Sequence, residues 1–68
     1  MKDVNDWYAS SQPEALIMAA GVTQQTGEGW FATDCSFNFT ERWAVKRASD
    51  GRCLSNGEAR DIKARSKR

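Results

Sequence analysis

The residues best able to bind a ligand are the basic side chains of the C-terminal segment. Arg60, Lys63 and Lys67 are spaced i, i+3 and i+7, so a helix would place them on one face. Cations in such a row attract nucleic-acid phosphates and position a strand without discriminating between bases. Further contacts are expected on or beside a sheet. The candidate phosphate-binding residues are Arg60, Lys63, Lys67, Arg68, Lys46, Arg47 and Arg52.

The two halves of the chain differ strongly in charge. Residues 1–41 contain one basic and six acidic residues, whereas residues 42–68 contain nine basic and three acidic residues. Such asymmetry indicates nucleic acid or another anionic partner. Two alternatives stay open: the halves attract each other in the folded protein, or the C-terminal charges only solubilise a tail.

Aromatic residues suggest a different class of function. An exposed patch around Trp7, Tyr8 and Trp30 would anchor a protein partner, as would the acidic N-terminal half. The chain would then be a protein-interaction module such as a small inhibitor or adaptor. Alternatively, Trp30 covers the sheet edge or packs under the N-terminal helix.

Enzymatic chemistry has little support in the composition. The chain has no histidine, the commonest general base and metal ligand, and its carboxylates form no converging pair. Two cysteines alone cannot complete a structural zinc site. We therefore expect no catalysis, cofactor, metal or small-molecule substrate.

The N-terminal part, residues 1–21, has a helical pattern. Apolar residues from Val4 to Met18 recur at helical spacing, and Pro13 suits a first helical turn. Ser11 and Glu14 have the spacing of a capping box. The sequence predicts a short turn or helix near residues 3–9 and then a helix over residues 12–20 that ends at Gly21.

Residues 29–55 alternate as strands do. The pattern predicts a meander of three antiparallel strands in which Phe39 pairs with Trp43. Asp50-Gly51 predicts a two-residue turn that pairs Arg47 with Leu54 in a third strand over 52–55. This register places a set of apolar residues inward and Trp30 and Ala32 on the opposite side. The inward set is Phe31, Phe37, Phe39, Trp43, Val45 and Leu54.

The same register makes two further predictions. Cys35 and Cys53 lie on opposite sheet faces, which predicts two free thiols. Replacing Phe37 or Trp43 with alanine should largely unfold the protein, and replacing Trp30 should have a milder effect.

Residues 56–68 are predicted to form a basic helix or tail opened by a second capping box, Ser55 to Glu58. The resulting α-β-β-β-α order, with Ser55-x-x-Glu58-Ala59 before a basic helix, resembles the layout of double-stranded RNA-binding domains. That family carries a basic pair where Asn56 and Gly57 stand here. We predict an α+β fold: one domain, residues 1–68, with an N-terminal helix, a three-stranded antiparallel sheet and a basic C-terminal helix.

Length and composition limit the remaining classes. The chain has 68 residues and no run of about 20 apolar residues that could span a bilayer. No apolar segment of a signal peptide follows Met1 and Lys2, so a cytoplasmic protein is expected. Together these features predict a small non-enzymatic regulatory or accessory protein that binds DNA or RNA through its basic C-terminal half; the alternative is the protein-interaction module.

Overall fold

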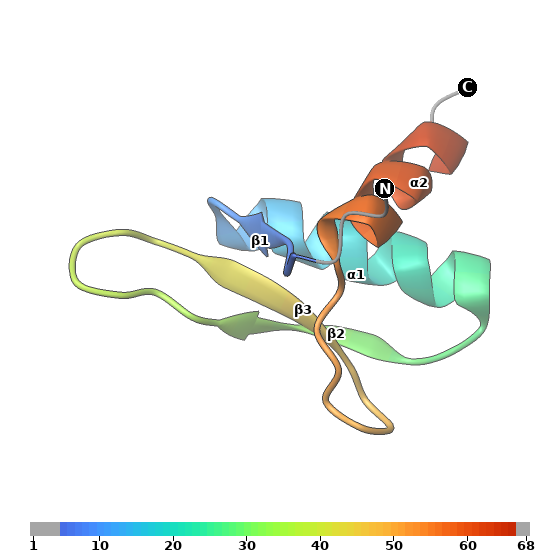
Figure 1. The fold of residues 1–68 in the computed structure, drawn as a ribbon, viewed down its shortest axis with the longest axis horizontal. Helices are drawn as coiled ribbons and strands as arrows, with labels where there is room; N and C mark the ends of the chain where they lie inside the picture. Colours follow the sequence, from blue (N-terminus) through green and yellow to red (C-terminus); the bar gives the residue numbers. More distant parts are fainter. Residues whose placement is uncertain (1–4, 67–68) are drawn as a thin grey trace.

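The computed structural model describes residues 5–66 and shows a small α+β domain (Figure 1). Three antiparallel strands form one sheet in the order β1-β3-β2. Helix α1 packs against the sheet and helix α2 packs against α1, so both helices lie on the same side of the sheet. The predicted fold class is confirmed. The elements are β1 (Tyr8–Ala9), α1 (Gln12–Thr26), β2 (Trp30–Asp34), β3 (Trp43–Arg47) and α2 (Asn56–Ser66).

Helix α1 is longer than the sequence predicts. It continues through Gly21 and ends at Gly27, whose φ of 77° is the left-handed conformation that glycine adopts without strain. The backbone N–H of Gly27 donates a 2.9 Å hydrogen bond to the carbonyl of Thr23. Gly21 lies inside the helix at its contact with α2, where a Cβ would be 3.4 Å from Cγ2 of Ile62, about van der Waals distance.

The register of β2 and β3 reverses the predicted faces of β2, whereas Trp43 and Val45 of β3 stay on the inner side as predicted. Trp43 pairs with Asp34, five residues before the predicted partner Phe39. Because side chains alternate with a period of two, this odd shift moves every side chain of β2 to the other face. Trp30 is therefore buried at 9% exposure, and Phe31 is 45% exposed. The predicted inward position of Phe31 is wrong.

A loop over residues 35–42 accounts for this shift. The Asp34 carboxylate accepts a 2.8 Å hydrogen bond from the backbone N–H of Ser36 just after β2 ends. Phe37 and Thr40 then exchange backbone hydrogen bonds of 3.1 and 3.0 Å across a tight turn. Phe37 and Phe39 consequently lie in the loop and are exposed, so their predicted inward positions are also wrong.

The third strand of the sheet is β1, not residues 52–55, so the short turn or helix predicted near residues 3–9 is wrong at Tyr8–Ala9. Tyr8 pairs with Ala44, on the side of β3 away from β2. Residues 52–55 form isolated bridges, one of which joins Cys53 to Lys46. This pairing differs by two positions from the predicted register, and an even shift keeps the face. Leu54 therefore points inward as predicted and is fully buried.

The observed β-α-β-β-α order differs from the double-stranded RNA-binding layout.

The two predicted capping boxes have different outcomes. At α2, the Glu58 N–H donates to Ser55 Oγ at 3.2 Å, and the Ser55 N–H donates to Glu58 Oε1 at 3.1 Å, as predicted. At α1, Ser11 makes no side-chain cap. Glu14 instead accepts 3.2 Å hydrogen bonds from the backbone N–H and hydroxyl of Ser10.

Both helices and the inner sheet face enclose one small core. It contains two tryptophans but few large aliphatic side chains, so each large residue accounts for much of the buried area. Ala32 and Trp43 pack against its border. The buried cluster consists of Trp7, Ala9, Ala15, Met18, Ala19, Val22, Trp30, Val45, Leu54, Ala59 and Ile62.

An ion pair beside the β3 turn predicts acid sensitivity. Arg47 donates to the Asp50 carboxylate from Nε at 3.0 Å and from Nη2 at 2.6 Å. The backbone N–H of Arg52 donates to the same carboxylate at 3.1 Å. These bonds lower the pKa of Asp50 to about 2 from 3.8. A pKa that is lower in the folded state stabilises the fold above the unfolded pKa, and this contribution is lost as pH falls from about 4 to about 2.

We therefore expect the unfolding temperature to fall across that window. Asp50→Asn should remove part of the fall, as measured by circular dichroism melts at successive pH values. Identical acid profiles for the variant and the wild type would contradict this role of Asp50.

Candidate functional site

The side of the sheet away from the helices is the first candidate surface. On β3, Trp43 and Val45 face the core, so Ala44 and Lys46 point to the uncovered side. Their cross-strand partners share this side. The same alternation adds Arg42 and Cys35, which are hydrogen-bonded to each other, at one end of this side of the sheet. It adds Cys53, the bridge partner of Lys46, at the other end. We call this surface the open face; its residues are Tyr8, Phe31, Thr33, Cys35, Arg42, Ala44, Lys46 and Cys53.

The open face combines aromatic rings with cations. Tyr8 and Phe31 are 39% and 45% exposed. The guanidinium carbon of Arg42 lies 4.5 Å from the centroid of the Tyr8 ring. Ala44 lies between these larger side chains and is itself buried. The resulting surface is a partly apolar platform bordered by positive charge.

Electrostatics on this platform favour an anion. None of its eight side chains is a carboxylate. Asp6 lies at the border, where the Tyr8 hydroxyl donates a 3.5 Å hydrogen bond to its carboxylate. Desolvation and the Asp6 charge raise the pKa of Tyr8, whereas Arg42 lowers it. Tyr8 therefore remains a neutral ring at physiological pH, suited to stacking.

The loop between β2 and β3 adds two more aromatic rings. It extends beyond the end of the sheet, away from the helices (Figure 1). Phe37 and Phe39 are 68% and 106% exposed there. Together with Tyr8 and Phe31, they make the exposed aromatic surface of the described residues different from the expected one, because Trp7 and Trp30 are buried.

Helix α2 carries a second basic surface. Arg60 and Lys63 are exposed, and the Lys63 ammonium lies 5.6 Å from the centroid of the Trp7 ring. Both side chains border a cavity of about 230 Å³ together with Trp7, Asn56 and Ala59. The structure thus brings together the first two residues of the predicted basic row. Lys67 and Arg68 lie outside the described residues.

Arg47 and Arg52 form ion pairs with carboxylates of the same chain. Arg47 bridges Asp50 and Glu28, with an Nη1 to Glu28 Oε1 distance of 3.3 Å. Arg52 donates to both oxygens of Glu58 at 3.2 and 3.1 Å, beside the α2 capping box. Of the three predicted basic residues on or near the sheet, Lys46 is the one on the open face.

The cysteines occupy the open face at a distance from each other. Cys35 follows β2 on one side of β3, whereas Cys53 bridges β3 from the side of β1. Their predicted placement on opposite faces is therefore wrong. Both are free thiols in the structure, because the strand order separates them.

Among residues 5–66, no three His, Cys, Asp or Glu side chains are grouped so that they could hold a metal ion. None of the helices in the described part of the chain is long and apolar enough to cross a membrane.

The fold and the open face define a small β-α-β-β-α domain with one uncovered sheet face. Comparisons with protein-family models, curated proteins and solved structures found no match.

Proposed function

We propose that this chain is a small, non-enzymatic regulatory or accessory protein that binds single-stranded nucleic acid on its open face. The observation that carries the proposal is the pairing of exposed rings, Tyr8 and Phe31, with the cations Arg42 and Lys46. Proteins bind single strands by stacking bases on aromatic side chains while basic residues follow the phosphates. Duplex DNA would offer no unstacked bases to these rings.

The basic residues of α2 extend this binding path around one sheet edge. Tyr8 belongs to the open face, and the preceding residue, Trp7, lies beneath Lys63. Consecutive residues of an extended segment point to opposite sides. A nucleic-acid strand that stacks on Tyr8 and passes over this sheet edge therefore reaches Lys63 and Arg60. These two cations supply phosphate contacts in the proposal.

Two free cysteines suit a reducing compartment, and we place the protein in the cytoplasm. RNA and single-stranded DNA share the stacking and phosphate chemistry that the open face offers. Both are therefore arms of the test.

The salt dependence of binding tests the phosphate contacts. We expect the wild type to bind a fluorescent single-stranded oligonucleotide with micromolar affinity at low salt. On single strands, each lost phosphate contact flattens the slope of log affinity against log salt by about 0.7. Lys46→Gln should flatten it by about 0.7, and Arg60→Gln with Lys63→Gln by about 1.4.

Arg65→Gln is the matched control, because it removes one charge from α2 outside the proposed path. Its slope should equal that of the wild type. Fluorescence anisotropy with RNA and DNA of the same base sequence measures all four proteins. Absence of wild-type binding to both, or equal slopes for every variant, would contradict the proposal.

A further inference from the structure

The outer side of α1 has an unusual composition for a surface helix. Among its 15 residues, Glu14 is the single charged one. Leu16 and Ile17 are 53% and 74% exposed, and Ala20 and Gln24 lie exposed one and two turns further on. Helices in water usually present charged residues outward, whereas a helix that is apolar on all sides is usually buried. This surface therefore has the character of an interface.

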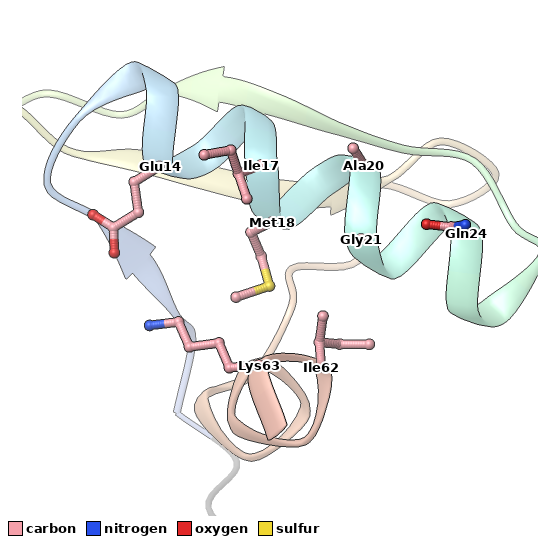
Figure 2. A pocket seen from close by; sticks show the side chains of 8 residues that line it. All are labelled: Glu14, Ile17, Met18, Ala20, Gly21, Gln24, Ile62 and Lys63. Carbon is pink, nitrogen blue, oxygen red and sulfur yellow. The ribbon is translucent and has the colours of Figure 1, made fainter. Parts of the chain in front are cut away.

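A groove lies next to this surface, between α1 and α2. It has a volume of about 610 Å³, and Ile17, Met18, Gly21 and Ile62 line it (Figure 2). At Gly21 the two helices lie close together, because a Cβ there would be 3.4 Å from Cγ2 of Ile62. The groove is hydrophobic and large enough to receive aliphatic side chains.

Two opposite charges border this groove. The Glu14 carboxylate and the Lys63 ammonium extend from α1 and α2 at the same end of the groove, beside the Met18 side chain (Figure 2). A two-fold interface uses the same patch on both subunits, so the patch must complement itself. An uncharged stripe with one acid and one base at its border meets this requirement: Glu14 of each copy can face Lys63 of the other.

We infer that the occupant of this groove is a second copy of the chain, with α1 packed against α1 about a two-fold axis. Ile17 of each copy then enters the groove of the other. Because α1 lies on the helix side of the sheet, such a dimer leaves both open faces uncovered (Figure 1). Lys63 borders both the groove and the proposed nucleic-acid path, so the dimer is tested on the protein without nucleic acid.

Sedimentation equilibrium of the protein without nucleic acid tests this inference. We expect the wild type to dimerise in a concentration-dependent way, with a Kd below about 100 µM. Ile17→Lys places an unpaired charge in the apolar contact and should raise the dimer Kd at least about tenfold. Phe39→Lys introduces the same charge at an exposed site far from the groove and should leave the Kd unchanged.

A charge exchange provides the second variant set. Glu14→Lys should weaken the dimer through like-charge repulsion, and Glu14→Lys with Lys63→Glu should restore it. A wild type that stays monomeric at about 500 µM would overturn the inference, as would equal effects of Ile17→Lys and Phe39→Lys. A monomer that associates through α1 only with a different protein would overturn it as well.

Discussion

Trp30→Ala is expected to unfold most of the protein, whereas Phe37→Ala is expected to leave it folded. Trp30 is 9% exposed and packs in the core, but Phe37 is 68% exposed in the loop between β2 and β3. Truncating a buried tryptophan to alanine costs about 3–5 kcal/mol. A domain of this length has a total stability of about 3–10 kcal/mol. Surface substitutions usually change stability by less than about 0.5 kcal/mol.

Urea unfolding monitored by far-ultraviolet circular dichroism measures both free energies. Phe39→Ala is the control for general effects of removing a phenylalanine from this loop, and its midpoint should match that of Phe37→Ala. The contrast between Trp30 and Phe37 opposes the expectation from the sequence. Equal destabilisation by Trp30→Ala and Phe37→Ala would contradict the observed register of β2 and β3.

Removing both rings from the open face should largely abolish nucleic-acid binding. Each base stacked on an aromatic side chain contributes about 1–3 kcal/mol. The combined change Tyr8→Ala and Phe31→Ala should therefore weaken binding at least about 30-fold. Both rings are partly exposed, so much less buried area is lost than at Trp30.

The matched control exchanges the rings instead of removing them. A variant with Tyr8→Phe and Phe31→Tyr keeps two stacking surfaces and should bind within about threefold of the wild type. Anisotropy titrations at one salt concentration give the affinities, and circular dichroism confirms folding. Full affinity in the double alanine variant would rule out stacking on these two residues.

Local signals in the sequence predicted the starts of both helices and the last turn. Pro13 marks the first turn of α1, and the Ser55 and Glu58 pair marks the start of α2. The hairpin turn at Asp50-Gly51 is present, although with four loop residues instead of two. Each of these signals depends on groups only three or four residues apart, so a short sequence window contains both partners of the interaction.

The sheet register depends on groups distant in the sequence. Residues 30–34 carry an aromatic ring on each side, Trp30 and Phe31, so alternation alone does not select the inner face. Contacts with α1 accompany the observed choice: the backbone N–H of Trp30 donates a 3.0 Å hydrogen bond to the Thr23 hydroxyl, and the Trp30 side chain joins the core. Likewise, α1 continues through Gly21, where Ile62 of α2 packs against it. Neither contact is visible in a local pattern.

The candidate site was predicted in part for the same reason. Lys46, Tyr8, Arg60 and Lys63 lie on the two surfaces described above. Phe31 was missed because the reversed register placed it in the core. The pairing of Arg47 with Glu28 joins residues 19 positions apart, which no local pattern indicates. The positive charge of the C-terminal half is thus partly used inside the fold.

The most direct test of the central claim is to map the binding surface residue by residue. Amide chemical shifts of the labelled protein can be followed by NMR while a single-stranded oligonucleotide is added. We predict that the largest changes fall on the open face, at Tyr8, Phe31, Ala44 and Lys46, with little change at Leu16–Ala20 on α1. Changes centred on α1, or none at saturating oligonucleotide, would contradict nucleic-acid binding by the open face.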